Sequence, residues 1–542
     1  MSLFDKILAA RGLSAESRAA FLLPDYSNLI DPFLLPDMNM AVERLVVAYD
    51  KQERITIYGD YDIDGLTATA VLMDAFDSFG FKNVDVFIPN RFIEGYGLTI
   101  DAVEQIVAGG AQLIITVDCG SQSEKEIIRA NELGVDVIVT DHHEVADVQP
   151  PAVAVVNPKR SDNSYPFSDF AGVGVVFKLV QALQTKLNGL PIGQEKWLLD
   201  LVALGTVCDV VPLIGENRTN VYWGLKVLKQ AKRQGLKALM AVARIEPKLL
   251  NARSLGFGLG PRMNAAGRLE TAQHALEMLV TDNPEIAFEK AQYLDELNVS
   301  RRTDQDKILK EAIVQAEGYN HDSVLVVSSP SWNHGIVGIV ASKLLEKYKK
   351  PVFVLQEMGD ESKGSARSFG DFSAASAIHA SQDLITKGGG HKLAAGVTMP
   401  TKNIAAFRQR INEFYKNQKL INQKSLLLPK ADASAELGEV TEELVDLISQ
   451  LEPFGYGNTQ PVIKADDLLV IDVRKMGTDA QHLKLALKDG NGKVMQFLAF
   501  NAHESLMVEI GARISVWFHP NINEWQGRRS VEGQLLHLEK SD

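Results

Sequence analysis

The sequence predicts an α/β protein of several domains: a parallel-sheet domain, a helical connector, a second α/β domain and a small C-terminal β-barrel. Three observations support this prediction. Apolar runs rich in Val and Ile alternate with helical segments from residue 54, the same alternation returns near residue 323, and short β-like runs separated by Gly, Asn and Asp fill the last part of the chain. Near-continuous apolar runs are typical of parallel strands that are buried on both faces. A chain of 542 residues is also longer than one hydrophobic core usually accommodates.

The first α/β domain is expected at residues 46–220, after an N-terminal helical segment at 1–45. Its strands are expected at RITIY (54–58), VDVFI (84–88), LIITV (113–117), VDVIV (136–140) and AVAVV (152–156). Segments with helical periodicity lie between them, for example 68–79 and 123–133. Such strand–helix alternation indicates an open sheet with helices on its faces.

A helical connector is expected at 221–318, and a second α/β domain at 319–418. The connector contains the Gly-rich stretch GFGLGPRMNAAGR (256–268), which predicts a turn, and a long polar helix at 289–317. The second domain is predicted from the β-like runs 323–329, 351–356 and 388–399 and from a helix after His334. A polar linker around 415–425 precedes the last domain.

Five β-like runs in residues 430–542 predict a small barrel such as an OB-fold, with a sandwich as the alternative. Trp517 and Phe518 lie in this region near Arg528 and Arg529. Aromatic side chains beside arginines can stack single-stranded bases, but the same two aromatics can equally belong to the core.

The composition places limits on location and partners. The net charge of −13 argues against a generic nucleic-acid binder, although ten Lys and Arg side chains and only one acid, Glu246, lie between Lys226 and Arg268. With only Cys119 and Cys208, neither a disulfide framework nor a Cys-rich zinc site is expected. No apolar run approaches the roughly 20 residues of a membrane span, and no signal-peptide pattern is present, so we expect a cytoplasmic protein without a membrane segment.

Three carboxylates at alternate positions, Asp60, Asp62 and Asp64, directly follow the first predicted strand. Because buried, unpaired charges are costly, these side chains must face water or a cation. A calcium loop would need Glu at its twelfth position, where this chain has Val71, and a helix before it. A solvated acidic turn remains the simpler alternative.

Further acidic and imidazole side chains follow other predicted strands. Asp118 follows the strand at 113–117, Asp141-His142-His143 follows the strand at 136–140, and Asp209 lies in the apolar segment ALGTVCDVVPL. The carboxyl ends of parallel strands form one edge, where open α/β sheets place their sites. Oxygen ligands with one or two imidazoles suit Mn²⁺ or Mg²⁺ better than zinc, and the carboxylates suffice for two ions.

The motifs DYDIDG, VDCG, TDHHE and GTVCDVVPL, in this order, resemble those of the DHH phosphoesterase superfamily, and GGGHKLAAG resembles its DHH-associated domain. PRMNAAGR, LEPFGYGN and the terminal barrel make the chain similar to the RecJ branch. The resemblance implies a two-metal centre with Asp118 as the bridging ligand. It assigns Asp60 and Asp62 to the first metal and Asp64, His142 and Asp209 to the second. It gives His143 to the scissile phosphate and Asp141 a supporting role, so the implied catalytic set is Asp118, Asp141, His142 and His143.

In one position the chain departs from many of these relatives. They carry a metal-binding His four positions before the residue equivalent to Asp62, where this chain has Tyr58. Whether Tyr58 or Asp60 completes the first metal shell is left open by the sequence.

The substrate-binding groups come from three other motifs. Glycines let backbone N–H groups approach an anion, so GGGHKLAAG nominates Gly389, Gly390 and His391, with a plain Gly-rich turn as the alternative. A forked Arg donor near a Ser suits a terminal phosphate. The resemblance therefore implies a site for the 5′-phosphate, against ordinary surface arginines, at Arg91, Ser365 and Arg367. PRMNAAGR nominates Arg262, Asn264 and Arg268 for the substrate cleft, against a structural helix junction.

The function implied by the resemblance is a Mn²⁺- or Mg²⁺-dependent exonuclease that digests single-stranded DNA from its 5′ end to 5′-mononucleotides in DNA repair and recombination. The implied partners are single-stranded DNA with a 5′ end, single-strand-binding protein and a helicase, and the implied state is a monomer. Two alternatives remain. One is a DHH-type oligoribonuclease, nucleotide phosphatase or cyclic-dinucleotide phosphodiesterase, and the other is a non-catalytic replication scaffold.

Overall fold

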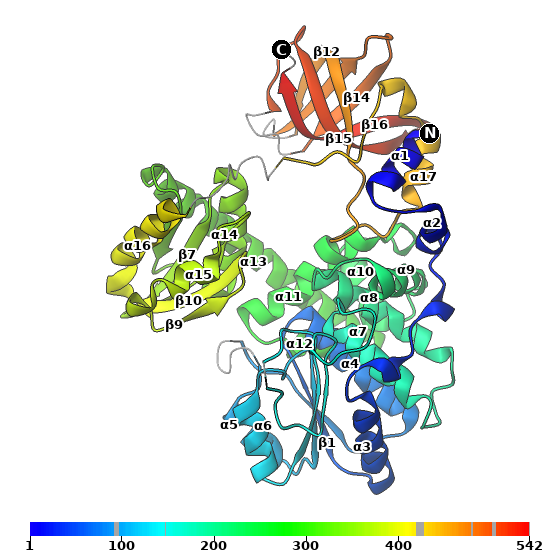
Figure 1. The fold of residues 1–542 in the computed structure, drawn as a ribbon, viewed down its shortest axis with the longest axis vertical. Coiled ribbons are helices and arrows are strands. Elements are labelled where there is room, and N and C mark those ends of the chain that lie inside the picture. Colours follow the sequence, from blue (N-terminus) through cyan, green and yellow to red (C-terminus); the bar gives the residue numbers. More distant parts are fainter. Residues whose placement is uncertain (92–96, 147, 419–427, 478–480, 501–505, 541–542) are drawn as a thin grey trace. The chain divides into compact units, whose positions relative to one another are not determined.

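The computed structural model describes residues 1–91, 97–146, 148–418, 428–477, 481–500 and 506–540 (Figure 1). The chain forms two compact units. The first comprises Met1–Asn264, Thr271–Gln292 and Pro429–Asp542, and the second comprises Ala265–Glu270 and Tyr293–Leu428. In the described part of the chain, no helix has both the length and the hydropathy that crossing a bilayer would require.

The first unit contains a five-stranded sheet in which all neighbouring strands are parallel. Its order is β2 (Val84–Phe87), β1 (Ile55–Gly59), β3 (Leu113–Val117), β4 (Asp136–Thr140) and β5 (Ala154–Val156). The strands coincide with the predicted runs to within two residues at their ends. β1, β3 and β4 are adjacent, so their carboxyl ends lie side by side. β2 differs from the expectation of burial on both faces, because an edge strand has one neighbour and its side chains stay partly exposed.

Helices cover both faces of this sheet. Tyr58, Ile114 and Val137 pack with α5 (Ile100–Ala108) and α6 (Glu124–Glu132) in one core. The other helices near the sheet are α3 (Met38–Lys51), α4 (Ile63–Phe79), α7 (Gly172–Leu183) and α8 (Leu199–Cys208). α4 begins five residues before the predicted start at 68, because Asp62 accepts hydrogen bonds from the N–H groups of Asp64 and Gly65 and caps the helix there.

The helices after α8 are α9 (Gly215–Leu228), α10 (Gln234–Val242), α11 (Gly260–Leu269), α12 (Gln273–Val280) and the long α13 (Pro284–Gly318). The stretch predicted as a Gly-rich turn is instead helical, since a π-helix at Ser254–Leu259 runs directly into α11. Tertiary packing outweighs the poor helix propensity of glycine here. Leu255, Leu259 and Met263 are fully buried, and Gly260 lets the backbone approach the Cys208 side chain.

The second unit is built on a five-stranded mixed sheet. Its order is β6 (Leu325–Ser329), β7 (Val352–Met358), β8 (Glu361–Arg367), β10 (Ala394–Pro400) and β9 (Lys387–Gly390), with β6 and β7 parallel and the other pairs antiparallel. α14 (His334–Tyr348), α15 (Ala374–His379) and α16 (Ile404–Asn417) pack on it. The small residues of β8 favour a turn by sequence alone. The segment is a strand because neighbours on both sides pair with it and because Ser362 and Ala366 are buried.

The C-terminal barrel consists of β12 (Ile463–Met476), β13 (His482–Lys488), β14 (Val494–Ala499), β15 (Arg513–Trp525) and β16 (Arg528–Lys540). Pairing of β12 with β15 closes it, which confirms the OB-like barrel over the sandwich. β11 (Ala433–Ser434) and α17 (Glu442–Ser449) adjoin it. Phe518 is fully buried in its core, whereas Trp517 stays half-exposed beside Lys464 and His537.

The N-terminal helices are α1 (Leu3–Ala10) and α2 (Ala15–Leu22). α1 inserts Leu3, Phe4 and Ile7 into the hydrophobic core of the barrel. Short 3₁₀ segments occur at Tyr26–Asn28, Pro32–Leu34, Gln194–Leu198, Pro247–Leu249, Gln382–Leu384, Thr401–Asn403 and Leu437–Glu439.

Candidate metal centre

The carboxyl ends of β1, β3 and β4 bring the predicted acidic and imidazole side chains together. Their possible ligand atoms fall into three groups, in each of which all the atoms lie within 4.8 Å of one another. The groups are Asp60, Asp62 and Asp118; Asp64, His142 and Asp209; and Asp118, His142 and His143. Asp118 and His142 each belong to two of the groups, so the three groups form one continuous cluster.

Local backbone geometry places two of these side chains. Asp118 has a φ of 63° at the end of β3, and Val210, directly after Asp209, has a φ of 62°. Both values lie in the left-handed region, which is uncommon for non-glycine residues and a genuine outlier for a β-branched one. Such strain persists only where surrounding structure enforces it, and it concentrates at functional sites.

Helix N-termini hold Asp62 and Asp64. Asp62 caps α4, while Asp64 accepts hydrogen bonds from the backbone N–H groups of Gly172 and Val173 at the start of α7. N–H groups at a helix N-terminus stabilise a carboxylate charge. They thus keep Asp64 in place although it is almost completely buried.

The cluster carries more negative charge than its surroundings can neutralise. Burial, followed by the charge of Asp62, raises the pKa of Asp64 to about 7. Burial, followed by the charge of Asp64, raises the pKa of Asp209 to about 9 and that of Asp118 well above its usual range. Burial lowers the pKa of His142 to about 3, so its imidazole is neutral near pH 7.

Several of these atoms lack the contacts that a buried polar atom needs. Within the described residues, Asp60 Oδ1, Asp118 Oδ1 and His142 Nε2 are buried without a hydrogen-bond partner. His142 Nε2 lies 3.1 Å from Asp118 Oδ1, 3.6 Å from Asp209 Oδ2 and 3.7 Å from Asp64 Oδ2. A neutral imidazole among carboxylates, with buried atoms left unsatisfied, fits divalent cations with mostly oxygen ligands.

Asp141 serves the site through His143. Its Oδ1 accepts from the backbone N–H of His142 and His143 and lies 2.8 Å from His143 Nδ1, while its Oδ2 accepts from the N–H of Ser121. Burial opposes ionisation of Asp141, but the hydrogen bond and charge of His143 lower its pKa overall. Burial likewise opposes protonation of His143, but Asp141 raises the pKa of that imidazole. Asp141 therefore orients His143 and favours its cationic form.

Glycines allow the elements to meet this closely. A Cβ at Gly172 would lie 2.6 Å from the Asp118 carboxylate, and one at Gly65 would lie 2.5 Å from the carbonyl oxygen of Asp60. Such distances are shorter than ordinary van der Waals contacts. A side chain at either position would therefore displace a candidate ligand.

Tyr58 and Asp60 have different partners. The Tyr58 hydroxyl donates to the carbonyl oxygen of Gly97, and its ring stacks on Phe87. Asp60 belongs to the group with Asp62 and Asp118. The structure thus favours Asp60 over Tyr58 as the side chain that completes the first metal shell.

Family models match three parts of the chain. Residues 54–206 match the N-terminal domain of the DHH family, 321–417 match the DHHA1 domain and 431–537 match the RecJ OB domain. The chain is 36% identical to the single-stranded-DNA-specific exonuclease RecJ of Escherichia coli (strain K12), over 92% of this chain and 89% of that protein. It is 37% identical to RecJ of Bacillus subtilis (strain 168), over 97% of this chain and 66% of that protein. The chain belongs to the RecJ family.

Solved structures of this family support the metal centre. RecJ of Thermus thermophilus in complex with Mn²⁺ superposes with a TM-score of 0.84 at 31% identity, covering 99% of this chain and 76% of that one. Its Mg²⁺ complex gives a TM-score of 0.79 at 28% identity and covers 99% of this chain and 74% of that one. This chain's set of oxygen and imidazole ligands suits either ion.

The residues nominated for the 5′-phosphate lie in both units of this RecJ-family chain. In the first unit, Arg91 lies over the Tyr61 ring at 5.2 Å. Burial and then the charge of Asp62 raise the pKa of Asp60 well above its usual range, and the charge of Arg91 offsets part of this rise. In the second unit, Ser365 and Arg367 lie on β8, and both side chains converge over Gly338 of α14, where a Cβ would be 3.2 Å from Ser365 Oγ.

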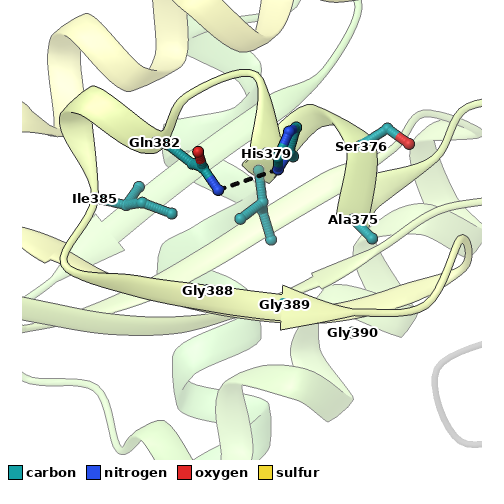
Figure 2. Close-up of a pocket in the computed structure, with 9 residues that line it drawn as sticks. Ala375, Ser376, His379, Gln382, Ile385, Gly388, Gly389 and Gly390 are labelled. Atoms are coloured by element: carbon teal, nitrogen blue, oxygen red, sulfur yellow. Dashed lines mark hydrogen bonds between the residues drawn. The ribbon is translucent and has the colours of Figure 1, made fainter. Parts of the chain in front are cut away.

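Gly389, Gly390 and His391 are exposed at β9, an edge strand whose only neighbour in the described sheet is β10. Figure 2 shows the pocket that this strand borders, with a volume of about 370 Å³. Its opposite wall includes His379 and Gln382, joined by a 3.1 Å hydrogen bond. An edge strand leaves alternate N–H and C=O groups available to a ligand.

The arginines nominated in the connector lie on helix α11, not on a turn. Arg262 Nη1 donates to the carbonyl oxygen of Gly258, and Arg268 Nη1 donates to that of Gly335. Asn264, on the same helix, is partly buried. Of the basic stretch around them, Arg233 is structural, because it is buried in ion pairs with Asp74 and Asp200.

Sequence reasoning missed Asn157 and Lys159. Asn157 is fully buried, and its amide donates to Ser121 Oγ and to the carbonyl oxygen of His143, which fixes the loop that carries the imidazole. Burial and the charge of Asp64 raise the pKa of Asp209, and the charge of Lys159 offsets part of this rise. Both follow β5 at the same carboxyl edge, so the rule that found Asp118 and Asp141 would have found them too.

Proposed function

We propose that this chain is a metal-dependent exonuclease that hydrolyses single-stranded DNA from its 5′ end to 5′-mononucleotides. The observation that carries the proposal is the cluster of Asp60, Asp62, Asp64, Asp118, His142 and Asp209 at one sheet edge, with buried ligand atoms unsatisfied. Relatives that share this chain's whole architecture are single-stranded-DNA-specific exonucleases. The five domains, at 1–45, 46–220, 221–318, 319–418 and 430–542, stay a prediction that limited proteolysis can test.

Two cations fit the cluster. Asp60 and Asp62 would hold the first ion. The second ion would be held by Asp64, His142 and Asp209. Asp118 would contact both ions. When bound, such a pair supplies Lewis-acid stabilisation of the phosphate oxygens. It also lowers the pKa of a bound water, so that hydroxide is available as the nucleophile near neutral pH.

The chain's own residues bind and orient the phosphate. Burial lowers the pKa of His143, but the hydrogen bond and charge of Asp141 raise it overall and so favour the cationic form, in which the opposite nitrogen of this partly exposed ring would donate to a non-bridging phosphate oxygen. Lys159 adds positive charge beside Asp209. Arg91, together with Ser365 and Arg367, would bind the terminal 5′-phosphate and so define the polarity of digestion. Gly389, Gly390 and His391, and Arg262, Asn264 and Arg268, would contact the strand's phosphodiester backbone.

The proposed partners and location are those that suit a single-stranded DNA substrate. We propose a monomer that acts in the cytoplasm in DNA repair and recombination, with single-strand-binding protein and a helicase supplying the single strand. Copurification would test the partners, and size-exclusion chromatography would test the monomeric state.

The direct test compares digestion of a 5′-phosphorylated single strand with that of the same strand in a duplex and with dinucleotide substrates. We expect the single strand to be degraded from its 5′ end in Mn²⁺ or Mg²⁺. Asp118→Ala should reduce the rate about a thousandfold or more, because it removes the shared ligand. A strong preference for dinucleotides, or undiminished digestion by Asp118→Ala, would contradict the proposal.

A further inference from the structure

An aromatic side chain is exposed close to the metal centre. Phe257 lies in the π-helix Ser254–Leu259 and is 79% exposed, whereas Leu255 and Leu259 on the same segment are fully buried. Single exposed apolar residues are common and need no explanation on their own. π-Helical segments, however, are frequent at functional sites, and this one places a large apolar ring in solvent.

The backbone beneath this ring is rigidly positioned. A Cβ at Gly258 would lie 2.6 Å from Ile245 Cδ1, and one at Gly260 would lie 2.8 Å from Cys208 Sγ. The Cys208 thiol contacts the carbonyl oxygen of Leu255 at 3.8 Å. The π-helix is thus packed tightly on the end of α8, next to the candidate ligand Asp209. The backbone that carries the ring is therefore already ordered before a ligand binds.

A cation accompanies the ring. The Arg253 guanidinium lies 5.6 Å from the centroid of the Phe257 ring, and Arg253 is itself exposed. It is also close enough to His519 of the barrel to lower the pKa of that imidazole. An exposed aromatic ring beside a guanidinium is the combination that stacks a nucleobase and contacts its phosphate without sequence preference.

The position of the ring relative to the metal centre suggests which part of the strand it contacts. Arg91 lies at the Asp60 end of the cluster, where the proposed function places the 5′-phosphate. The π-helix packs on Cys208, which directly precedes Asp209 in the chain. A strand whose 5′ end is bound near Arg91 would continue past Asp209 toward Phe257.

We propose that Phe257, with Arg253, forms a stacking platform for a nucleobase of single-stranded DNA on the 3′ side of the scissile bond. This inference rests on the proposed function, since it assigns the direction of the strand from the 5′-phosphate site. The platform would hold the strand that remains after each cleavage and would be indifferent to its sequence.

The test is a double-mutant cycle between the ring and a base, carried out with the full-length protein. The variants are Phe257→Ala, Phe257→Leu and Phe257→Trp, with Phe288→Ala as control, because Phe288 is a partly exposed Phe on another helix, α13. Binding of 5′-phosphorylated 12-nucleotide strands is measured in EDTA by fluorescence anisotropy. The strands are intact or carry one abasic site at the second, third or fourth nucleotide.

We expect Phe257→Ala to weaken binding of the intact strand about tenfold, within the range of one base–aromatic stack. Phe257→Trp should retain binding, and Phe257→Leu should lose most of the effect of the ring. One abasic position should weaken the wild-type protein but leave Phe257→Ala unchanged, because the stacking partner is already absent. Hydrolysis of bis(p-nitrophenyl) phosphate in Mn²⁺ should be equal in all variants.

Two outcomes would overturn the inference: wild-type affinity in Phe257→Ala, or a loss that is the same for intact and abasic strands at all three positions. A loss of bis(p-nitrophenyl) phosphate hydrolysis in Phe257→Ala as large as its loss of strand binding would also overturn the inference, since the ring would then act on the metal centre. Because binding is measured without hydrolysis, failure of the proposed function shows separately, as absent cleavage of the same strand in Mn²⁺.

Discussion

Individual side chains in the candidate metal centre are placed where they destabilise one another. Asp64 and Asp118 are almost completely buried among further carboxylates, and the pKa values of Asp64 and Asp209 are raised to about 7 and about 9 by burial and mutual repulsion. Retaining such a cluster is costly in a protein without bound cations. Bound cations would neutralise the carboxylates and so remove most of this cost.

The raised pKa values predict a pH-dependent stability of the metal-free protein. In the unfolded chain Asp64 and Asp209 titrate near 3.8, so between about pH 4 and their folded pKa values the folded state binds more protons. The free energy of unfolding should therefore fall as pH rises through this window. The lowered pKa of His142 acts in the opposite sense below its unfolded value of 6.5. In EDTA we therefore expect Tm to decrease from about pH 6.5 to about pH 8, and added Mn²⁺ to raise Tm more at the higher pH.

The control is Asp209→Asn, which cannot ionise and should flatten the fall of Tm with pH. Asp141 contributes in the opposite sense, because its lowered pKa gives stability that is lost only in more acidic solution. A Tm in EDTA that rose across the same range would contradict the electrostatic account of the cluster.

At the level of secondary-structure elements, the start of α7 connects two candidate ligands. The N–H groups of Gly172 and Val173 hold Asp64, while the missing side chain of Gly172 leaves room for Asp118. The same helix turn therefore binds one candidate ligand, Asp64, and leaves room for another, Asp118. Loss of supporting contacts of this kind typically lowers metal affinity about 10- to 100-fold.

Gly172→Ala is expected to lower Mn²⁺ affinity about tenfold or more, as measured by isothermal titration calorimetry. The added Cβ would lie 2.6 Å from the Asp118 carboxylate and would displace it. Helix propensity alone predicts a neutral or stabilising change, because Ala is the better helix former. Gly318→Ala, at the end of α13, is the matched control, since a Cβ there meets nothing within 4 Å. Unchanged affinity in Gly172→Ala would show that Asp118 does not depend on this contact.

In the first unit as a whole, segments distant in sequence are joined through a buried guanidinium. Arg218 of α9 is 2% exposed, donates to the carbonyl oxygens of Phe21, Leu451 and Glu452, and stacks on the Phe21 ring at 3.9 Å. Its hydrogen bonds join α9 to the N-terminal segment at Phe21 and to the segment after α17 at Leu451 and Glu452. α1, in turn, completes the core of the barrel.

Arg218→Met should reduce the free energy of unfolding by about 3 kcal/mol, because buried carbonyl oxygens lose their donor while the apolar stem is kept. Urea denaturation would measure the loss, and we expect the barrel to unfold in a separate, earlier transition. Arg528→Met, at an exposed position in β16, should change stability by less than about 0.5 kcal/mol. Similar stabilities of the two variants would mean that Arg218 does not hold these segments together.

The order of the elements and the identity of the candidate ligands were accessible from sequence. The strands of the first sheet are continuous apolar runs, and each carboxylate or imidazole that follows such a run is brought to the shared edge by the parallel topology. The barrel was likewise readable from five short alternating runs. In these places the sequence pattern that predicts the structure is local. Neither hydrophobic periodicity nor the placement of sites at the carboxyl ends of parallel strands depends on distant contacts.

Other features were decided only by tertiary structure. β8 and the helical form of GFGLGPRMNAAGR contain small residues with weak propensity, and their conformation depends on neighbours that pair with them or pack over their glycines. The exposure of Phe257 and the commitment of Tyr58 to Gly97 likewise follow from packing. The sequence by itself thus determined which chemical groups gather at the sheet edge. The tertiary structure decided which of them remain unsatisfied there, because burial and hydrogen bonding depend on the whole surrounding chain.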